Sequence, residues 1–422
     1  MPKLRFKGFT DDWEQRKFHE VFDGLPNNTL SRADLNYEKG EAQNIHYGDI
    51  LVKFGDYVDA TTEDLPYISD KKLVDKFSNS FLQDGDIIIA DTAEDETVGK
   101  CTEIVGAQGK KLISGLHTIP CRPRQRYAPK FLGYYMNSNS YHAQLRPLMQ
   151  GVKVISISKG VLQDTKMVLP QSVGEQGKIG AYFSNLDNLI TFHERKCDEL
   201  QTVKKYMLQK MFSKKGEKIP EIRFAGFTGD WVQRKLSSIY NDIGNAFVGT
   251  ATPYYVEDGH FYLESNNIKD GQINHNSEIF INDEFYEKQK DKWLHTGDMV
   301  MVQSGHVGHA AVIPEELNNS AAHALIMFRH PKEKIEPYFL NYQYQTKKSK
   351  KKIENITTGN TIKHILASDM QKFIVDVASY QEQVKIADYF RRLDDLIALH
   401  QRKHDTLKEI KKYMLQNMFP EK

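Results

Sequence analysis

Cysteines, long apolar runs and net charge are all scarce in this sequence. It has three cysteines in 422 residues, Cys101, Cys121 and Cys197, too few and too scattered for a disulfide framework or a zinc site. No apolar run approaches the roughly 18–20 residues of a membrane-spanning helix. The first residues, MPKLRFKGFT, lack the apolar core of a secretory signal. We therefore expect a cytoplasmic protein without disulfides and without membrane contact.

Motifs for nucleotide and metal chemistry are absent as well. There is no GxxxxGK[ST] phosphate loop and no Asn-Pro-Pro-aromatic stretch of an adenine methyltransferase. Asp64, Asp70 and Lys72 only imitate a nuclease D…DxK set at very short spacing. His306 and His309 lack the third ligand and the helical context of a zinc site. These absences argue against an enzyme, and we expect no catalytic residue, metal or cofactor in this chain.

Charge of neither sign dominates. The sequence has 57 Lys and Arg against 56 Asp and Glu, giving a formal net charge of +1. Nucleic-acid-binding domains often have a pI above about 9, with their basic residues on one face. If this protein binds DNA, its cationic surface must be local, or partner proteins must supply the rest.

An internal duplication is the main positive feature. RFKGFTDDWEQRKF (residues 5–18) returns as RFAGFTGDWVQRKL (residues 223–236), and residues 175–212 return at 382–419. Aligned from Lys178 and Lys385, 21 of 35 positions are identical. The chain is therefore two tandem units. We predict a leading segment and first domain (1–173), a long helix (174–213), a linker (214–220), a second leading segment and domain (221–380) and a second long helix (381–420).

The two long repeated segments are predicted to be helices that pair as a coiled coil. Each would span about 36 residues, with seam residues at alternating steps of three and four and one lysine, Lys204, interrupting the first series. His193 and His400 occupy equivalent positions, which we interpret as polar register-setting sites rather than a metal pair. Asp187 and Asp394 lie beside the seam and should form ion pairs. The predicted seam residues are Ile179, Phe183, Leu186, Ile190, His193, Cys197, Leu200, Met207 and Met211, with Ile386, Phe390, Leu393, Ile397, His400, His404, Leu407, Met414 and Met418 in the second helix.

Between the repeats lie a first body (residues 20–170) and a second body (residues 237–378) that diverge but keep a common order of elements. DGDIIIA (84–90) corresponds to TGDMVMV (296–302), each a turn into a buried strand. A helix with Pro in its first turn follows at 129–138 and 337–346. Glycine-led loops follow at 149–162 and 357–370. We predict a mixed α/β fold with two pseudo-symmetric domains.

EQGKIGAYFSNLDNLI (175–190), EQVKIADYFRRLDDLI (382–397) and the motifs around Trp13 and Trp231 resemble the specificity subunits of type I restriction–modification systems. The resemblance covers essentially the whole chain. It implies two target-recognition domains, each reading one half of a split, asymmetric site in double-stranded DNA. It also implies that the helices form an antiparallel coiled coil, which sets the spacing and docks two methyltransferase subunits. Two motor–nuclease subunits would then join the complex.

The same resemblance implies that this chain is not catalytic. Adenine N6 methylation with S-adenosylmethionine, and cleavage driven by ATP and Mg²⁺, would belong to the partners. A different class stays open, in which the chain is a duplicated enzyme or nuclease whose long helices only dimerise its domains. Such an enzyme should keep its active-site residues in both bodies, and the divergence of the bodies disfavours it.

Candidate DNA contacts lie mainly on the glycine-led loops, where polar and basic side chains could reach base edges and phosphates. A run of lysines in the second body predicts a phosphate-contacting patch. In the first body the candidates are Lys100, Gln150, Lys153, Ser156, Ser158 and Lys159. In the second body they are Ser304, His306, Lys347, Lys348, Lys350, Lys351, Thr358, Asn360, Thr361 and Lys363.

Overall fold

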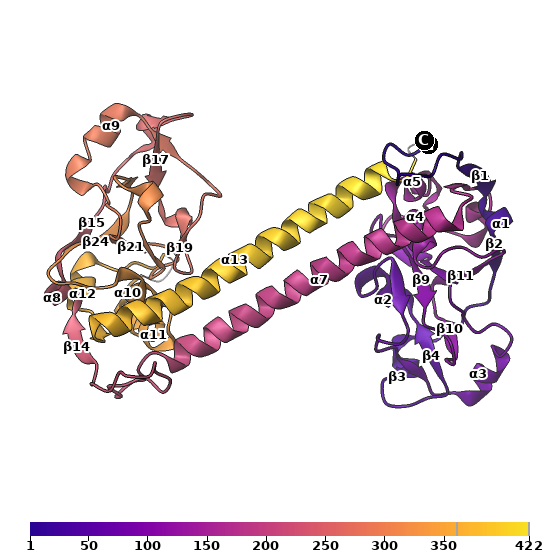
Figure 1. Cartoon of the computed structure of the whole chain (residues 1–422), viewed down its shortest axis with the longest axis horizontal. Coiled ribbons are helices and arrows are strands. Elements are labelled where there is room, and N and C mark those ends of the chain that lie inside the picture. The colour runs from indigo at the N-terminus through magenta and orange to yellow at the C-terminus, as the bar shows by residue number, and fades with distance from the viewer. Residues whose placement is uncertain (360–361, 421–422) are drawn as a thin grey trace. The chain divides into compact units, whose positions relative to one another are not determined.

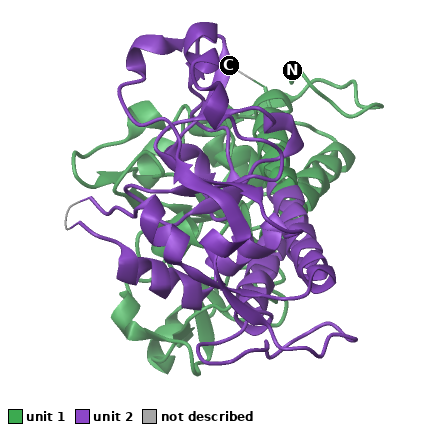
Figure 2. Cartoon of the chain, turned by 90° about the vertical axis from the view of Figure 1, so that its left-hand side faces the viewer, with its two compact units in different colours: residues 1–194, 402–422 green, residues 195–401 purple. Residues whose placement is uncertain are grey.

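The computed structural model describes residues 1–359 and 362–420 and contains two compact units (Figures 1 and 2). Unit 1 consists of residues 1–194 together with the chain from residue 402 onward, and unit 2 consists of residues 195–401. The candidates Asn360 and Thr361 lie outside the described residues. Within the described part of the chain, no helix is long and apolar enough to cross a membrane.

Two helices of 38 residues each, α7 (Val173–Lys210) and α13 (Tyr380–Asn417), confirm the predicted long helices (Figure 1). Neither contains proline, and Glu175 and Glu382 place a favourable negative charge in each first turn. The start of α7 belongs to unit 1 with the end of α13, and the end of α7 belongs to unit 2 with the start of α13. The helices therefore pair antiparallel, as the family resemblance implied.

The first body is built on two sheets. A five-stranded sheet has the order β2-β11-β7-β9-β5, and a four-stranded sheet has the order β10-β4-β6-β3. The predicted buried strand is β7, whose four residues are all buried between antiparallel β11 and β9. The strands are β1 (Glu14–Lys17), β2 (Phe22–Gly24), β3 (Leu35–Asn36), β4 (Ala42–Ile45), β5 (Tyr57–Asp59), β6 (Tyr67–Ile68), β7 (Ile87–Ala90), β8 (Thr92–Ala93), β9 (Cys101–Val105), β10 (Leu112–Ser114), β11 (Thr118–Pro123), β12 (Ile155–Ser156) and β13 (Lys166–Leu169). The helices are α1 (Phe18–Val21), α2 (Tyr47–Val52), α3 (Lys71–Lys76), α4 (Phe131–Asn137), α5 (Asn139–His142) and α6 (Lys159–Leu162).

The second body also has two sheets, with the orders β15-β24-β21-β22 and β16-β20-β17-β23. Its strand β21 is the counterpart of β7 and is likewise buried at all four residues. The strands are β14 (Val232–Lys235), β15 (Tyr240–Asn245), β16 (Tyr255–Val256), β17 (His260–Leu263), β18 (Ile268–Lys269), β19 (Gln272–Ile273), β20 (Phe280–Ile281), β21 (Met299–Val302), β22 (Ala310–Val312), β23 (Ala321–Ala322), β24 (Leu325–Pro331) and β25 (Ile374–Val377). The helices are α8 (Leu236–Ile239), α9 (Asp283–Glu287), α10 (Pro337–Tyr344), α11 (Lys347–Ile356) and α12 (Ala367–Lys372).

The repeated leading segments hold the start of each long helix. β1 pairs antiparallel with β13, and β14 pairs in the same way with β25. Arg5 donates two hydrogen bonds to the buried carboxylate of Glu175, at 2.5 and 2.8 Å. Arg223 does the same to Glu382, at 2.6 and 2.7 Å. Paired arginine–carboxylate forks of this kind fix geometry as well as charge, which explains why the segment is written twice.

A phenylalanine that follows the end of each long helix fills part of the core of one unit, and we call it the helix-end plug. In unit 1, the ring of Phe419 packs against Trp13, Tyr135 and Phe183, with centroids 5.6–6.4 Å apart. In unit 2, Phe212 packs against Trp231, Phe339 and Phe390 at 5.3–6.0 Å. Each long helix therefore starts against one body and ends in the core of the other unit.

Polar residues at the helix pair repeat in the same way. Lys204 forms an ion pair with Asp394 at 2.5 Å, and Lys411 forms one with Asp187 at 2.7 Å, so the ion pairs predicted for the two aspartates are confirmed. Lys411 also reaches Asp56 at 2.9 Å. Burial disfavours its charged form, but the two carboxylates outweigh burial and raise the pKa of Lys411.

The predicted seam residues fall into two groups by exposure. Most of these residues in the first half of each helix are buried, as are Met211 and Met418 just past the helix ends, whereas several residues in between are half-buried. The buried ones are Ile179, Phe183, Leu186, Ile190, His193, Cys197, Met211, Ile386, Phe390, Leu393, His404 and Met418. The half-buried ones are Leu200, Met207, Ile397, His400, Leu407 and Met414.

Candidate nucleic-acid interface

The two glycine-led loops, here called the first loop (residues 150–156) and the second loop (residues 358–364), close in the same way. In the first, the backbone groups of Gln150 and Ser156 exchange hydrogen bonds of 3.0 and 2.8 Å. In the second, Thr358 and His364 exchange bonds of 2.9 and 2.8 Å. Bodies of divergent sequence therefore close these loops with the same pair of backbone hydrogen bonds.

A glycine makes each loop possible. Gly151 has φ +118°, and a Cβ there would lie 1.9 Å from the carbonyl oxygen of Val154. Gly359 has φ +95°, and its Cβ would lie 2.1 Å from the carbonyl oxygen of Ile362. Only glycine allows both this backbone conformation and this close approach. The glycine in the sequence pattern is thus a requirement of the turn.

Each loop is fixed to the segment that follows the buried central strand. In the first body, β12 pairs antiparallel with β8, which follows β7 directly. In the second body, Ser304 bridges His364, and Gly305 N–H donates to the Lys363 carbonyl at 3.0 Å. The structure therefore brings the candidate Ser304 beside the second loop, and it ties each loop by backbone pairing to the segment after the buried strand.

The candidate side chains of the first loop divide into exposed and structural ones. Gln150, Lys153 and Ser156 are exposed, and Val152 at the tip is 97% exposed. Ser158 instead accepts a hydrogen bond from Val161 N–H and caps α6. Hydrogen-bonding groups and an exposed apolar side chain can read a base edge and a thymine methyl group, respectively.

Two other candidates of the first body lie against its own backbone. Lys100 turns inward: its Nζ donates to the carbonyl oxygens of Leu51 and Phe54, both at 3.0 Å. Burial lowers the pKa of Lys100. The side chain of Lys159 covers Gly24 of β2, since a Cβ on that glycine would meet its Nζ. Lys100 is therefore withdrawn into the body, whereas Lys159 remains exposed.

The candidate side chains on and beside the second loop are mostly exposed. Thr358 and Lys363 are exposed. His306 is exposed as well, and its Nε2–H donates to the Ser265 carbonyl at 2.9 Å. A hollow of about 270 Å³ opens between the turn at His306–His309 and α11, with Lys350 and Lys363 on its wall. Two lysines therefore line this hollow beside the second loop, together with the carboxylates of Asp270 and Glu354.

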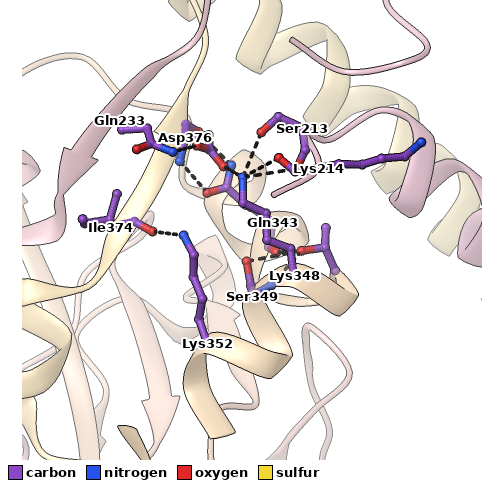
Figure 3. A network of polar contacts seen from close by, with 10 residues as sticks. Ser213, Lys214, Gln233, Gln343, Lys348, Ser349, Lys352, Ile374 and Asp376 are labelled. Atoms are coloured by element: carbon purple, nitrogen blue, oxygen red, sulfur yellow. Dashed lines mark hydrogen bonds and ion pairs between the residues drawn. The ribbon is translucent and has the colours of Figure 1, made fainter. Parts of the chain in front are cut away.

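The lysine run forms the start of α11, and its members point in different directions. Figure 3 shows the Lys348 ammonium turned inward to Asp376 and to the first residues of the linker. It lies 2.5 Å from the Asp376 carboxylate and donates to Ser213 at 3.2–3.3 Å. Lys352 donates to the Ile374 carbonyl at 3.0 Å, and burial lowers the pKa of Lys352. Lys347, Lys350 and Lys351 stay exposed.

An acidic segment beside the first loop escaped the sequence reasoning. Residues 91–97 (DTAEDET) connect β7 to the next turn, where the second body has only residues 303–306 (QSGH). Of these acids, Asp95 accepts hydrogen bonds from Thr97 and Glu96 pairs with Arg146 at 3.5 Å. The sequence sign of this segment is that the connection after the buried strand is longer in the first body than in the second.

The structure offers no support for a nuclease or metal site. Asp70, a member of the nuclease-like set, caps α3 by accepting hydrogen bonds from Lys72 N–H and Leu73 N–H. Across residues 1–359 and 362–420, no group of three or more His, Cys, Asp or Glu side chains could hold a metal ion.

Comparison with known proteins adds independent findings. The family model described as the type I restriction modification DNA specificity domain matches residues 10–202 and 229–409. The MjaX type I restriction enzyme specificity subunit of Methanocaldococcus jannaschii is 22% identical over 416 residues, 96% of this chain and 92% of the relative. The MjaVIII specificity subunit of the same organism is 21% identical over 279 residues, 64% of this chain and 65% of the relative.

A solved structure shares the fold. The S subunit of a type I restriction–modification system from M. genitalium superposes with a TM-score of 0.60 at 13% identity, covering 100% of this chain and 99% of that one. The two stretches matched by the family model contain the two glycine-led loops and most of both long helices.

Proposed function

The chain belongs to the type I restriction–modification DNA specificity family, and from this premise we propose that its two bodies read the two halves of one bipartite, asymmetric DNA site. As a specificity subunit it recognises DNA sequence and is not itself an enzyme. The finer assignment gives each loop its own half-site. The helix pair then keeps the two readers at one spacing, so that both half-sites bind as a single event.

One observation carries this proposal: the two loops are closed by the same backbone hydrogen bonds after an equivalent glycine but present different side chains. The first loop offers Gln150, Lys153 and Ser156, whereas the second offers Thr358 and Lys363. A catalytic duplicate would need the same chemical groups in both copies. Two readers of different sequences need the same support and different contacts, and this combination is what the bodies have.

The experiment exchanges the first body, residues 20–170, for that of another family member. In cells that also express the partner subunits, methylated adenines are then mapped across the genome. We expect one half of the methylated site to change, with the other half and the spacer length intact. A matched exchange of residues 237–378 should change the other half. Simultaneous change of both halves in either exchange would contradict independent reading.

The helix pair is also the proposed docking surface for two methyltransferase subunits. Eight large apolar residues of α7 and α13 are 39–56% exposed, and they occupy four pairs of equivalent positions. Unit 1 presents Leu189, Phe192, Ile410 and Tyr413, and unit 2 presents Leu396, Leu399, Val203 and Tyr206. Repeated apolar patches outside a coiled-coil seam favour two copies of one partner.

In that complex S-adenosylmethionine would be bound by the methyltransferase subunits, and ATP and Mg²⁺ by two restriction subunits. Introducing charge into one patch with Leu189→Lys and Ile410→Lys should reduce the methyltransferase bound from two copies to one, measured by native mass spectrometry. Asn188→Lys, on an exposed polar position of the same helix, is the control and should leave two copies bound. Two copies on the patch variant would place the partner elsewhere.

A further inference from the structure

The two bodies differ in the segment between α4 or α10 and the glycine-led loop that follows it. This segment has the same length in both, residues 138–149 in the first body and 346–357 in the second. In the second body it forms α11, a helix of 10 residues with five lysines. In the first body it forms the four-residue α5 and a short 3-10 turn, and it contains no lysine.

The cationic groups of the first-body segment are already in use. Arg146 pairs with Glu96 at 3.5 Å. His142 Nε2–H donates to the Val98 carbonyl at 2.9 Å, and burial lowers the pKa of His142. Three exposed acidic residues, Glu94, Asp95 and Glu96, shortly precede Val98, whose carbonyl holds His142. This surface is therefore poorly suited to approach a phosphate backbone.

In the second body, three lysines remain for an external partner. Lys348 and Lys352 are bound inside the body, but Lys347, Lys350 and Lys351 are exposed. Among the described residues none of these three forms an ion pair within 4.0 Å. All three lie in the first turns of α11, where positive charge opposes the helix dipole and like charges three or four residues apart repel. Helix stability does not account for this arrangement.

We propose that the second body alone supplies the sequence-independent hold on DNA, with Lys347, Lys350 and Lys351 contacting backbone phosphates beside the second loop. The first body reads its half-site without an equivalent phosphate grip. Duplex without a cognate site is then held mainly through unit 2, and the first body engages when its own half-site comes into reach. This inference rests on the proposed DNA-reading function and assigns one part of its contact.

The test uses the full chain assembled with its partner subunits and a DNA duplex that lacks the cognate site. Binding is measured over a range of salt for the wild type and for the triple variant Lys347→Gln, Lys350→Gln, Lys351→Gln. Each lost phosphate contact lowers the slope of log K against log salt by about 0.9. We expect a slope smaller by about 2–3 and, at about 0.1 M salt, a loss of affinity on the order of a hundredfold. The methylated sequence should not change.

A matched control removes the same charge from the first body. Lys71→Gln, Lys72→Gln, Lys76→Gln alters three exposed lysines of α3 and should change the slope by less than about one. An equal fall in slope in this control would show that net charge matters rather than α11, and would overturn the inference. A triple α11 variant with an unchanged slope and an intact methylation site would overturn it as well.

Folding and function are checked separately. The α11 variant should melt at the wild-type temperature or above it, because it relieves repulsion at the helix start. If the wild-type complex bound every duplex equally and methylated no defined sequence, the proposed function itself would fail and this inference with it. A defined methylation site combined with an unchanged salt slope is the distinct pattern in which only the inference fails.

Discussion

Units 1 and 2 are alike where the sequence repeats and differ in the bodies between the repeats. Both use an Arg–Glu fork at the helix start and a phenylalanine plug at the helix end. In contrast, the central sheet has five strands in one and four in the other, and only the second body has a lysine-rich helix. The repeated residues are thus the ones that build the scaffold.

Even within the scaffold, equivalent groups have different partners. Trp231 Nε1–H donates to Glu382 at 3.2 Å, whereas among the described residues the indole N–H of Trp13 has no hydrogen-bond partner. Helix α10 is capped by the carboxylate of Glu336, the residue directly before the helix, which accepts a hydrogen bond from Tyr338 N–H. Helix α4 is capped by Glu103 from the neighbouring strand β9. These differences allow the two units to be perturbed separately.

The largest effect is expected from removing a helix-end plug. Phe419 is 1% exposed within the unit 1 core, so Phe419→Ala should lower the free energy of unfolding of unit 1 by about 3–5 kcal/mol. Phe212→Ala should do the same to unit 2. Hydrogen exchange read by mass spectrometry should show faster exchange in the first body for Phe419→Ala and in the second body for Phe212→Ala.

Tyr413→Ala is the control for this prediction, because the ring is 56% exposed on the same helix. It should cost less than about 0.5 kcal/mol. Faster exchange confined to the last turn of α13 in Phe419→Ala would show that the plug does not support the first body.

The next largest effect separates the two Arg–Glu forks. Arg5→Met leaves the Glu175 carboxylate buried without its charged partner, which should cost unit 1 about 3 kcal/mol. Arg223→Met should cost unit 2 less, because Glu382 keeps the hydrogen bond from Trp231. Urea unfolding followed by unit-resolved hydrogen exchange gives both values. Adding Glu175→Gln to Arg5→Met should restore part of the lost unfolding free energy, because no unpaired charge is then buried. If Arg5→Met and Arg223→Met destabilise their units equally, the hydrogen bond from Trp231 to Glu382 contributes little.

The scaffold could be predicted from sequence because its signals are long and repeated. A seam period sustained over four heptads identifies a helix whatever the rest of the chain does. Asp187 and Asp394 occupy equivalent positions beside the seam, and this repetition predicted their ion pairs. Each loop was also marked by one glycine in a required conformation. These features depend on residues close together in the chain or on the comparison of two copies.

The direction of single lysines could not be predicted in this way. Lys100 turns to carbonyl groups of Leu51 and Phe54, and Lys348 turns to Asp376. Those acceptors are 28–49 residues away in the chain, and only the tertiary fold brings them into reach. A lysine-rich segment therefore predicts a cationic surface, but the fold decides which ammonium groups remain on it.

The smallest predicted effect concerns pH and again divides the units. Glu103 and Val312 hold equivalent sheet positions, since they pair with the first residues of β7 and β21. Burial raises the pKa of Glu103 to about 7, and the backbone N–H groups of Lys130 and Gly133 that donate to its carboxylate only partly offset this effect. The folded unit therefore holds a proton that the unfolded chain releases above its ordinary pKa of 4.5.

The stability that this proton provides is complete below pH 4.5 and is lost as pH rises to about 7, with about 2 kcal/mol of the loss falling between pH 5 and pH 7. Glu103→Gln keeps an acceptor for the α4 backbone but cannot ionise. We expect the difference in unfolding free energy between wild type and variant to shift against the wild type between pH 5 and pH 7 in unit 1, with unit 2 unaffected. Because other groups titrate equally in both proteins, they cancel in this difference. A difference that is constant with pH would show that Glu103 is ionised throughout, stabilised by its backbone donors more than burial penalises it.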